Sequence, residues 1–336
     1  MQFKNTDVVI KDISLFFLPV QTRVPLKFGS ETLEQVTCAR AKITVEDRSG
    51  NLGVGWGETP LSVQWVWPSA SAYSERHDAL VEFCKRLARA FLDFKCSGHP
   101  LEIGHEFIEE QLPHIRQAFN LERPTEAMPQ LAGLVAASVF DQAIHDAYGN
   151  VHEVDIYQTY GVDFMNRDLS WFFESNQQAG DSRVAFKGRY PNGYMIAEPP
   201  KRLPVWHLVG GLDPLVEEDR EGDEPMDGYP VVLVDWIERD GLKCLKIKLR
   251  GNDANWDYQR LVKIGEISLN HDVHSLTADF NCTVSDPQYV NEILDRLERE
   301  YPEIYRRLLY VEQPFPYDLE AHRIDVTSVS PRKPLF

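Results

Sequence analysis

Short apolar runs alternate with helical patterns from residue 203 onward, and this alternation restricts the fold more than any other feature. The apolar runs lie at 203–209, 244–249, 276–280, 309–311 and 333–336. Helical patterns fill the intervals at 231–239, 258–267 and 289–305. Strands and helices that alternate in this way usually form neighbouring parallel strands. The pattern therefore predicts a parallel sheet or barrel that begins near residue 203.

The preceding part of the chain has a different pattern, in which strands come before helices. Alternating patterns predict three strands, at 8–18, 36–46 and 52–58. Helical patterns follow at 77–94, 101–112 and 131–148. Strands followed by helices predict an α+β domain over residues 1–150. Residues 151–202 show no sustained period, so we expect a connecting segment before a domain at 203–336.

The charge balance argues against two classes of partner. Acidic residues outnumber basic residues by 52 to 35, and the formal net charge is −17. Proteins that bind nucleic acid or anionic membrane surfaces usually present a basic face, so we expect neither partner. The five cysteines form no CxxC pair, and the first residues form no apolar signal core. Both observations predict a reducing, cytoplasmic location.

Two lysines share one face of the predicted strand at 244–249. Lys246 and Lys248 are two residues apart, and side chains alternate along a strand, so both ammonium groups point the same way. A parallel strand covered by helices is usually apolar on both faces. The pair therefore indicates either an edge strand with solvated lysines or a functional site that contains an anion.

The next two predicted strands also end in polar residues. Asp279 and Asn281 share a face at the end of one strand, and Glu312 ends the other. Taken singly, Asp279 could cap the following helix, and Glu312 could be a solvated rim residue. However, the intervals from Lys248 to Asp279 and from Asp279 to Glu312 each match one βα unit, so these residues would meet at the carboxyl ends of neighbouring strands. Such carboxylates suit a hard divalent ion, and a lysine beside another cation suits a general base.

The motifs Lys-x-Lys, Asp-x-Asn and Glu-Gln-Pro on successive strands resemble the enolase superfamily, and most closely its mandelate racemase and muconate lactonizing enzyme branch. Further segments resemble the first capping loop, a hairpin strand, the helix leading into the barrel and the first barrel strand of that family, at 23–29, 53–58, 134–149 and 203–206. The resemblance does not cover residues 151–202 or the acidic loop at 216–227, which we expect to be solvated. It implies an α/β fold, with an α+β capping domain at 1–150 and the first part of a (β/α)7β TIM-like barrel at 203–336.

The resemblance also implies the chemistry of the site. Lys248 would remove the proton α to the carboxylate of a small substrate, and Lys246 would lower the pKa of Lys248 and help to bind that carboxylate. Asp279 and Glu312 would be the first two ligands of Mg²⁺, with Mn²⁺ as the alternative. Asn281 would form a hydrogen bond near the metal or the substrate. The enzyme would be an isomerase or a lyase that catalyses racemisation, epimerisation, cycloisomerisation or dehydration, and we expect a homo-oligomer.

The predicted barrel is incomplete. The stretch from 203 to 336 is about half as long as the roughly 250 residues of an eight-stranded barrel. We therefore expect a third acidic metal ligand and a partner acid or base to lie beyond residue 336. The alternative function is that of a truncated, non-catalytic barrel fragment that acts only in binding or oligomerisation.

Two aromatic residues of the first domain are further candidates for substrate binding. The resemblance implies that Trp65 lies in a loop that closes over the substrate, with Phe28 opposite it, and core packing is the alternative for Trp65. The glycines at 53, 55 and 57 suggest a nucleotide-binding loop. We reject that interpretation, because residue 58 is glutamate and the segment is a predicted hairpin strand.

Overall fold

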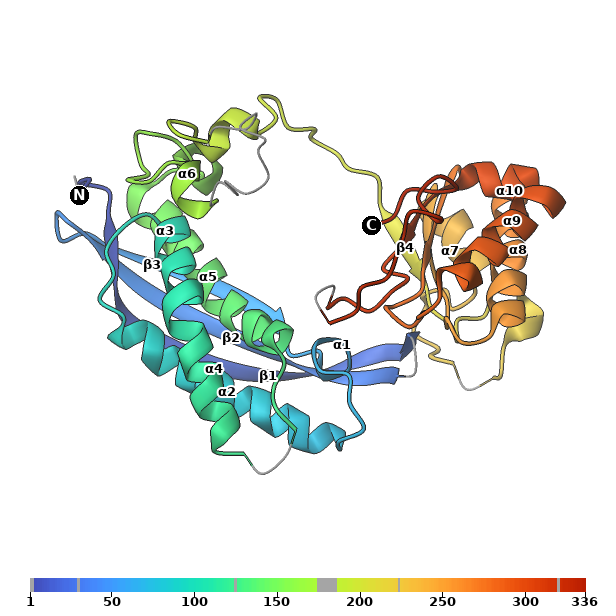
Figure 1. The fold of residues 1–336 in the computed structure, drawn as a ribbon, viewed down its shortest axis with the longest axis horizontal. Coiled ribbons are helices and arrows are strands. Elements are labelled where there is room, and N and C mark those ends of the chain that lie inside the picture. The colour runs from blue at the N-terminus through green and yellow to red at the C-terminus, as the bar shows by residue number, and fades with distance from the viewer. Residues whose placement is uncertain (1–2, 29–30, 124–125, 174–185, 223, 319–320) are drawn as a thin grey trace. The chain divides into compact units, whose positions relative to one another are not determined.

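The computed structural model describes residues 3–28, 31–123, 126–173, 186–222, 224–318 and 321–336 (Figure 1). The chain forms two compact units. The first comprises residues 1–20 and 35–199, and the second comprises residues 21–34 and 200–336. Each unit has its own hydrophobic core. The predicted domain boundaries near 150 and 203 stay a prediction.

A three-stranded sheet with the order β1-β2-β3 begins the chain. Its strands are β1 (Val8–Phe28), β2 (Glu31–Asp47) and β3 (Leu52–Pro60). They confirm the three predicted strands, and β2 and β3 are antiparallel. Residues 23–28 resemble a loop in sequence but continue β1, because β2 extends back to Glu31 and provides a pairing partner.

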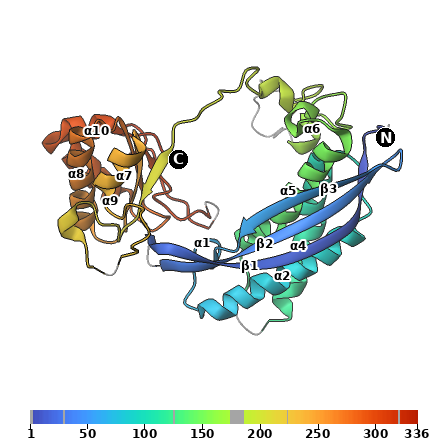
Figure 2. The ribbon, with the colours of Figure 1, turned by 180° about the vertical axis from the view of Figure 1, so that it is seen from behind.

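Helices cover one face of this sheet (Figures 1 and 2). They are α1 (Val63–Val66), α2 (Tyr73–Asp93), α3 (Pro100–Glu106), α4 (Leu112–Leu121) and α5 (Gln130–His152). The predicted helices at 77–94 and 131–148 are confirmed. The one predicted at 101–112 is divided between α3, a π-helical turn at Phe107–Gln111 and the start of α4. None of the helices in the described part of the chain is both long and apolar enough to cross a membrane.

Strand β3 has glycine at every second position on the face that meets α5. A Cβ atom on Gly55 would overlap the backbone of Ala143 and Ala147, and one on Gly57 would overlap the backbone of Val139. Glycine therefore lets the backbones of β3 and α5 approach closely. This packing explains the glycine pattern of β3 without a bound nucleotide.

Only short elements occur where the structure describes the segment 151–202. They are the 3₁₀ turns η2 (Ile156–Thr159) and η4 (Pro191–Tyr194) and the helix α6 (Leu169–Phe172). Buried polar contacts hold this segment to α3. The Glu102 carboxylate accepts hydrogen bonds from Asn166 Nδ2 at 3.1 Å and from the Arg167 backbone N–H at 2.6 Å. Asn166 and Arg167 are thereby held against α3 within the first unit.

The second unit contains a parallel sheet with the order β4-β5-β6-β7. Its strands are β4 (Trp206–Val209), β5 (Cys244–Lys248), β6 (Ser275–Asp279) and β7 (Leu308–Glu312). The helices are α7 (Leu233–Asp240), α8 (Ala254–Asn270), α9 (Pro287–Glu300) and α10 (Pro302–Arg307). They confirm the predicted alternation. The last predicted run also pairs with β7, because Val311 N–H donates to Pro334 O at 2.9 Å and Phe336 N–H donates to Val311 O at 3.0 Å.

Ion pairs hold two residues of the acidic loop at 216–227, Asp219 and Asp227. It begins with the 3₁₀ turn η5 (Glu217–Asp219). Lys263 Nζ lies 2.8 Å from Asp219 Oδ2, and Arg23 Nε lies 2.7 Å from Asp227 Oδ2. Arg23 also donates to the backbone carbonyls of Tyr229 and Pro230, at 2.9 and 3.0 Å. These bonds hold Arg23 of β1 to residues 227–230 within the second unit.

Replacement of Gly55 tests the packing of α5 on β3. We expect Gly55→Ala to lower the free energy of unfolding by about 3 kcal/mol, because the new methyl group would meet helix backbone that cannot rotate away. Gly193→Ala is the matched control, since a Cβ atom there meets nothing within 4 Å. Urea unfolding measures both variants, and equal stability of the two would contradict the close approach.

A buried histidine makes the first unit sensitive to acid. His99 Nδ1 accepts a hydrogen bond from the Leu101 backbone N–H at 3.2 Å, so the proton of the neutral ring lies on Nε2, which donates to the Thr159 hydroxyl at 2.8 Å. Burial, followed by the charges of three neighbouring basic groups, lowers the pKa of His99 to about 3. The unfolded chain takes up this proton near pH 6.5, so stability is lost as the pH falls from about 6.5 towards 3.

We expect His99→Asn to remove this acid sensitivity, because asparagine can still cap α3 but does not titrate. Relative to the variant, the wild-type chain should lose about 2 kcal/mol of unfolding free energy between about pH 7 and about pH 5. Urea unfolding at the two pH values measures this difference. His274→Asn, at an exposed loop position, is the control and should keep the wild-type slope. An unchanged slope in His99→Asn would show that another group causes the sensitivity.

Candidate active site

The two lysines of β5 project from the sheet face opposite the hydrophobic core. Leu245 and Ile247 alternate with them and are fully buried in the core of the second unit. The side chains of Lys246 and Lys248 are 25% and 12% exposed to solvent. Strand β5 pairs with β4 on one side and β6 on the other. The lysines therefore lie on an inner strand, and the edge-strand alternative is wrong.

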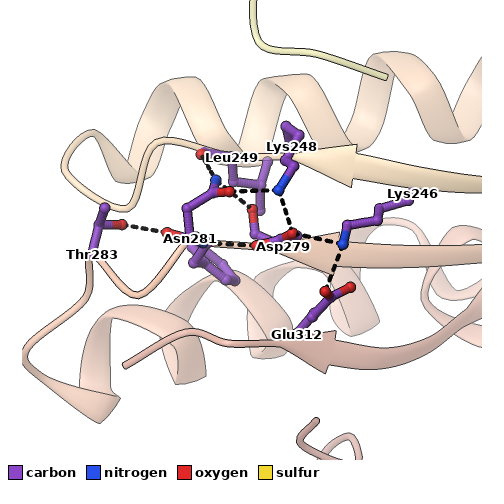
Figure 3. Close-up of polar contacts among 8 residues, drawn as sticks. Lys246, Lys248, Leu249, Asp279, Asn281, Thr283 and Glu312 are labelled. Atoms are coloured by element: carbon purple, nitrogen blue, oxygen red, sulfur yellow. Dashed lines mark hydrogen bonds and ion pairs between the residues drawn. The ribbon is translucent and has the colours of Figure 1, made fainter. Parts of the chain in front are cut away.

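The parallel register brings two carboxylates level with Lys248. Lys248 pairs with Asp279 on β6, and Asp279 pairs with Glu312 on β7. Residues paired in this way share a face of the sheet, and all three side chains point to the same side (Figure 3). Asp279 is the most deeply buried of the three, with 1% of its surface exposed.

Four charged groups meet on this face, and we call Lys246, Lys248, Asp279 and Glu312 the charge cluster (Figure 3). Lys246 Nζ lies 2.5 Å from Glu312 Oε1 and 3.0 Å from Asp279 Oδ2. Lys248 Nζ lies 2.6 Å from the same Asp279 oxygen. A buried carboxylate is costly unless it is paired, and here two lysines face two carboxylates. The sequence candidates on three strands are thus brought together.

The carboxylates keep Lys246 charged. Burial is the largest effect and acts to lower the pKa of Lys246, because the ammonium form loses hydration. The hydrogen bond to Glu312 and the charges of Asp279 and Glu312 together outweigh burial, so the pKa of Lys246 is raised above its ordinary value. Lys246 is therefore suited to bind an anion rather than to accept a proton.

Asn281 is fixed by hydrogen bonds at both ends of its amide. Its Nδ2 donates to the Leu249 carbonyl at 3.1 Å, and its Oδ1 accepts a hydrogen bond from Lys248 Nζ at 2.6 Å. Its backbone N–H donates to Asp279 Oδ1 at 2.8 Å. The backbone of Asn281 has φ 53°, a left-handed conformation that asparagine tolerates. Asn281 can therefore orient Lys248.

Sequence reasoning missed two strained positions beside the site. Cys282 and Gln313 also have left-handed backbones, with φ values of 60° and 38°. The Cys282 backbone N–H donates to the Gln313 carbonyl at 2.7 Å and so joins the ends of β6 and β7. Such conformations persist where the surrounding structure imposes them. Neither residue type signals this conformation, so no sequence pattern could have found it.

Sequence reasoning also missed Asp257 on α8, which is fully buried. Its carboxylate accepts hydrogen bonds from the backbone N–H groups of Arg250 and Gly251, at 2.7 and 2.9 Å, and from the Tyr289 hydroxyl at 2.6 Å. Burial raises the pKa of Asp257 despite these bonds. They fix the loop that follows β5 and therefore the end of the strand that carries Lys248. In sequence, Asp257 shows only the common preference for acids in a first helical turn.

The two aromatic candidates are not part of the charge cluster. Trp65 lies on α1 in the first unit with 46% of its surface exposed, which disfavours the core-packing alternative. Phe28 is the last residue of β1, and its side chain lies outside the described residues. A role of either residue in substrate binding stays a prediction.

The carboxylates of Asp279 and Glu312 are chemically suited to a hard divalent ion. Mg²⁺ is often held by one or two protein carboxylates and keeps several waters. One oxygen of each carboxylate lies within 3.0 Å of Lys246 Nζ, so the two converge on a single cation position. No group of three or more His, Cys, Asp or Glu side chains that could hold a metal occurs in the described part of the chain. The pair therefore fits as two ligands of a hydrated ion.

Comparison with known proteins finds similar structures. No protein-family model and no curated protein sequence matches the chain. The L-Ala-D/L-Glu epimerase from Bacillus subtilis matches with a TM-score of 0.56 and 18% identity, over 94% of this chain and 64% of that chain. A dipeptide epimerase from Enterococcus faecalis, complexed with Mg and the dipeptide L-Leu-L-Tyr, matches with a TM-score of 0.52 and 17% identity, over 96% of this chain and 65% of that chain. A mandelate racemase/muconate lactonizing enzyme matches with a TM-score of 0.51 and 14% identity, over 98% of this chain and 66% of that chain.

At these identities the likeness shows the fold. The chain spans slightly less than two thirds of the length of these structures, between 64% and 66%. Within that span, an antiparallel sheet with its helices is followed by alternating parallel strands and helices. The predicted fold class, and the resemblance that implied it, are therefore confirmed at the level of fold.

Removal of the buried carboxylate tests the pairing within the charge cluster. We expect Asp279→Asn to lower the free energy of unfolding by about 3 kcal/mol, because both lysines lose the carboxylate that they share. The matched control is Asp272→Asn, which breaks the solvent-exposed pair with Lys243 and should cause no comparable loss. Urea unfolding measures both. Equal effects would mean that burial does not strengthen the pairing at Asp279.

Proposed function

We propose that this chain, which has the fold of the mandelate racemase and muconate lactonizing enzyme branch of the enolase superfamily, contains the site of an enzyme that removes the proton α to a carboxylate. The observation that carries the proposal is the convergence of the charge cluster and Asn281 at the ends of three neighbouring parallel strands. Active sites of parallel βα barrels are built at this edge of the sheet.

Lys248 is the proposed base. In its neutral form, Nζ would take the α-proton of the substrate and become an ammonium group paired with Asp279, 2.6 Å away. Asn281 Oδ1 accepts an N–H bond from Nζ at 2.6 Å and so directs the nitrogen lone pair away from itself. A base held by two acceptors in this way approaches the substrate from a fixed direction.

Lys246 would bind the substrate carboxylate through its ammonium group, because it lies beside Lys248 on the same face of β5. Asp279 and Glu312 would hold Mg²⁺, or alternatively Mn²⁺, which supplies positive charge against the carboxylate as it gains electron density. The Mg in the dipeptide epimerase from Enterococcus faecalis supports this choice. Trp65 and Phe28 stay proposed substrate-binding residues, as the resemblance implies.

The proposed reaction is a racemisation or epimerisation, with cycloisomerisation and dehydration as alternatives. Two of the similar structures are epimerases that act on short peptides according to their names. A dipeptide or an N-acylated amino acid is therefore the first substrate class to test. Both compounds contain the carbonyl group next to the α-carbon that this chemistry needs.

We expect the wild-type chain with Mg²⁺ to exchange the α-proton of a dipeptide for solvent deuterium, and Lys248→Ala to lose this exchange by about 10³-fold, as is typical for a general base. Proton NMR in deuterated buffer measures the rate. Lys243→Ala is the matched control, because Lys243 is exposed and pairs with Asp272 away from the charge cluster. Addition of a chelator should abolish the wild-type rate.

Two outcomes would decide against this proposal in different ways. Exchange that survives in Lys248→Ala would mean that another group is the base. A folded wild-type chain that exchanges no dipeptide or N-acylated amino acid would instead favour the alternative of a non-catalytic binding or oligomerising protein.

A further inference from the structure

Two carboxylates of the charge cluster share one cation, and that cation belongs to the chain itself. Lys246 Nζ lies 2.5 Å from Glu312 Oε1 and 3.0 Å from Asp279 Oδ2. The Asp279 side chain is almost fully buried, and its other oxygen, Oδ1, already accepts the backbone N–H of Asn281 at 2.8 Å. The Asp279 oxygen that faces Glu312 is thus the one that binds Lys246.

A divalent ion and this ammonium group cannot occupy the same position. Mg²⁺ binds carboxylate oxygens at about 2.0–2.1 Å and demands near-octahedral geometry. An ammonium group that lies between the same two oxygens would overlap with the ion and repel it, since both are positively charged. Mg²⁺ can therefore bind Asp279 and Glu312 together only if the Lys246 ammonium moves out.

Lys246 is better placed to move than Lys248. The side chain of Lys246 is 25% exposed, whereas that of Lys248 is 12% exposed. Lys248 Nζ also bonds to the Asn281 amide, which is itself held by the Leu249 carbonyl. The ion pairs of Lys246 are with the two carboxylates. If these carboxylates bind a metal, Lys246 loses its partners and needs another anion.

We propose that Lys246 is a tethered cation that competes with the divalent ion for Asp279 and Glu312, so that metal binding frees its ammonium group to receive the substrate carboxylate. The inference rests on the proposed function for the identity of the ion and the substrate. It makes binding ordered, with the metal first and the carboxylate second. Lys246 would pair first with Asp279 and Glu312 and then with the substrate carboxylate. The buried carboxylates would be paired throughout, first with Lys246 and then with the metal.

The test compares Mg²⁺ binding by the wild-type chain, Lys246→Met and Lys248→Met, measured by calorimetric titration at constant ionic strength. Methionine keeps the length of the side chain and removes the charge. Each variant removes one positive charge from the same strand, so a general charge effect is matched between them. We expect Lys246→Met to bind Mg²⁺ about tenfold more tightly than the wild-type chain, because no ammonium group has to be displaced. The affinity of Lys248→Met should change less, because Lys246 lies between both carboxylates whereas the ion pair of Lys248 is with Asp279.

Thermal unfolding gives a second readout that does not need catalysis. Without a divalent ion, Lys246→Met should unfold at a lower temperature than the wild-type chain, because Asp279 and Glu312 lose the cation between them. Mg²⁺ should raise the unfolding temperature of Lys246→Met by more than it raises that of the wild-type chain. Glu312→Gln should weaken Mg²⁺ binding both in the wild-type chain and in Lys246→Met. That result would show that the ion binds at the Glu312 carboxylate.

The outcomes separate this inference from the proposed function. If both lysine variants tighten Mg²⁺ binding equally, the effect is one of net charge, and the competition is overturned while the metal site stands. Weaker binding by Lys246→Met than by the wild-type chain would also overturn it. If neither the wild-type chain nor either lysine variant binds Mg²⁺, the proposed role of Mg²⁺ is wrong. The proposed competition between Lys246 and the ion is then wrong as well.

Discussion

The carboxylate of Asp279 is 1% exposed and bonds to two ammonium groups, and the second unit is organised around this pairing. A charge so deeply buried is tolerated only with partners of opposite sign. The partners come from β5, so the register between β5 and β6 has to be maintained. A slip of one residue would turn Lys246 and Lys248 into the hydrophobic core and bring Leu245 and Ile247 to the charged face. Charge pairing and core packing therefore select the same register.

The helix-covered face of this sheet and the carboxyl ends of its strands differ in packing and in backbone conformation. The face towards the helices is packed with apolar side chains. Three residues with a left-handed backbone, Asn281, Cys282 and Gln313, follow the carboxyl ends of β6 and β7. Asp257 holds the neighbouring loop through two backbone N–H groups. Stability is thus supplied by the helix side, and it supports an arrangement at the strand ends that local preferences alone would not select.

The sequence predicts well which face of a strand a side chain occupies. It predicts less well which group that side chain bonds to. Alternation along β5 predicts that Lys246 and Lys248 lie together, and the spacing of βα units predicts that Asp279 and Glu312 lie near them; the structure places all four in contact. Which lysine bonds to which carboxylate depends on strand register and twist, which no local pattern contains. The sequence did not predict the buried hydrogen bonds of Asp257 or the left-handed backbone of Gln313. Both features arise where loops meet, and these loops meet only in the folded chain. The extension of β1 to Phe28 also depends on a partner, namely the first residues of β2.

The candidate site and the glycine packing of β3 lie in different parts of the chain. Every member of the charge cluster, and Asn281, comes from the second unit, within three strands and the turn after β6. The first unit is stabilised by other means, above all by the packing of α5 against the glycines of β3. Sequence changes at exposed positions of the first unit, such as Trp65, can therefore occur without disturbing the pairing of buried charges. Changes on β5 or β6 cannot, because each charged side chain there is the partner of another.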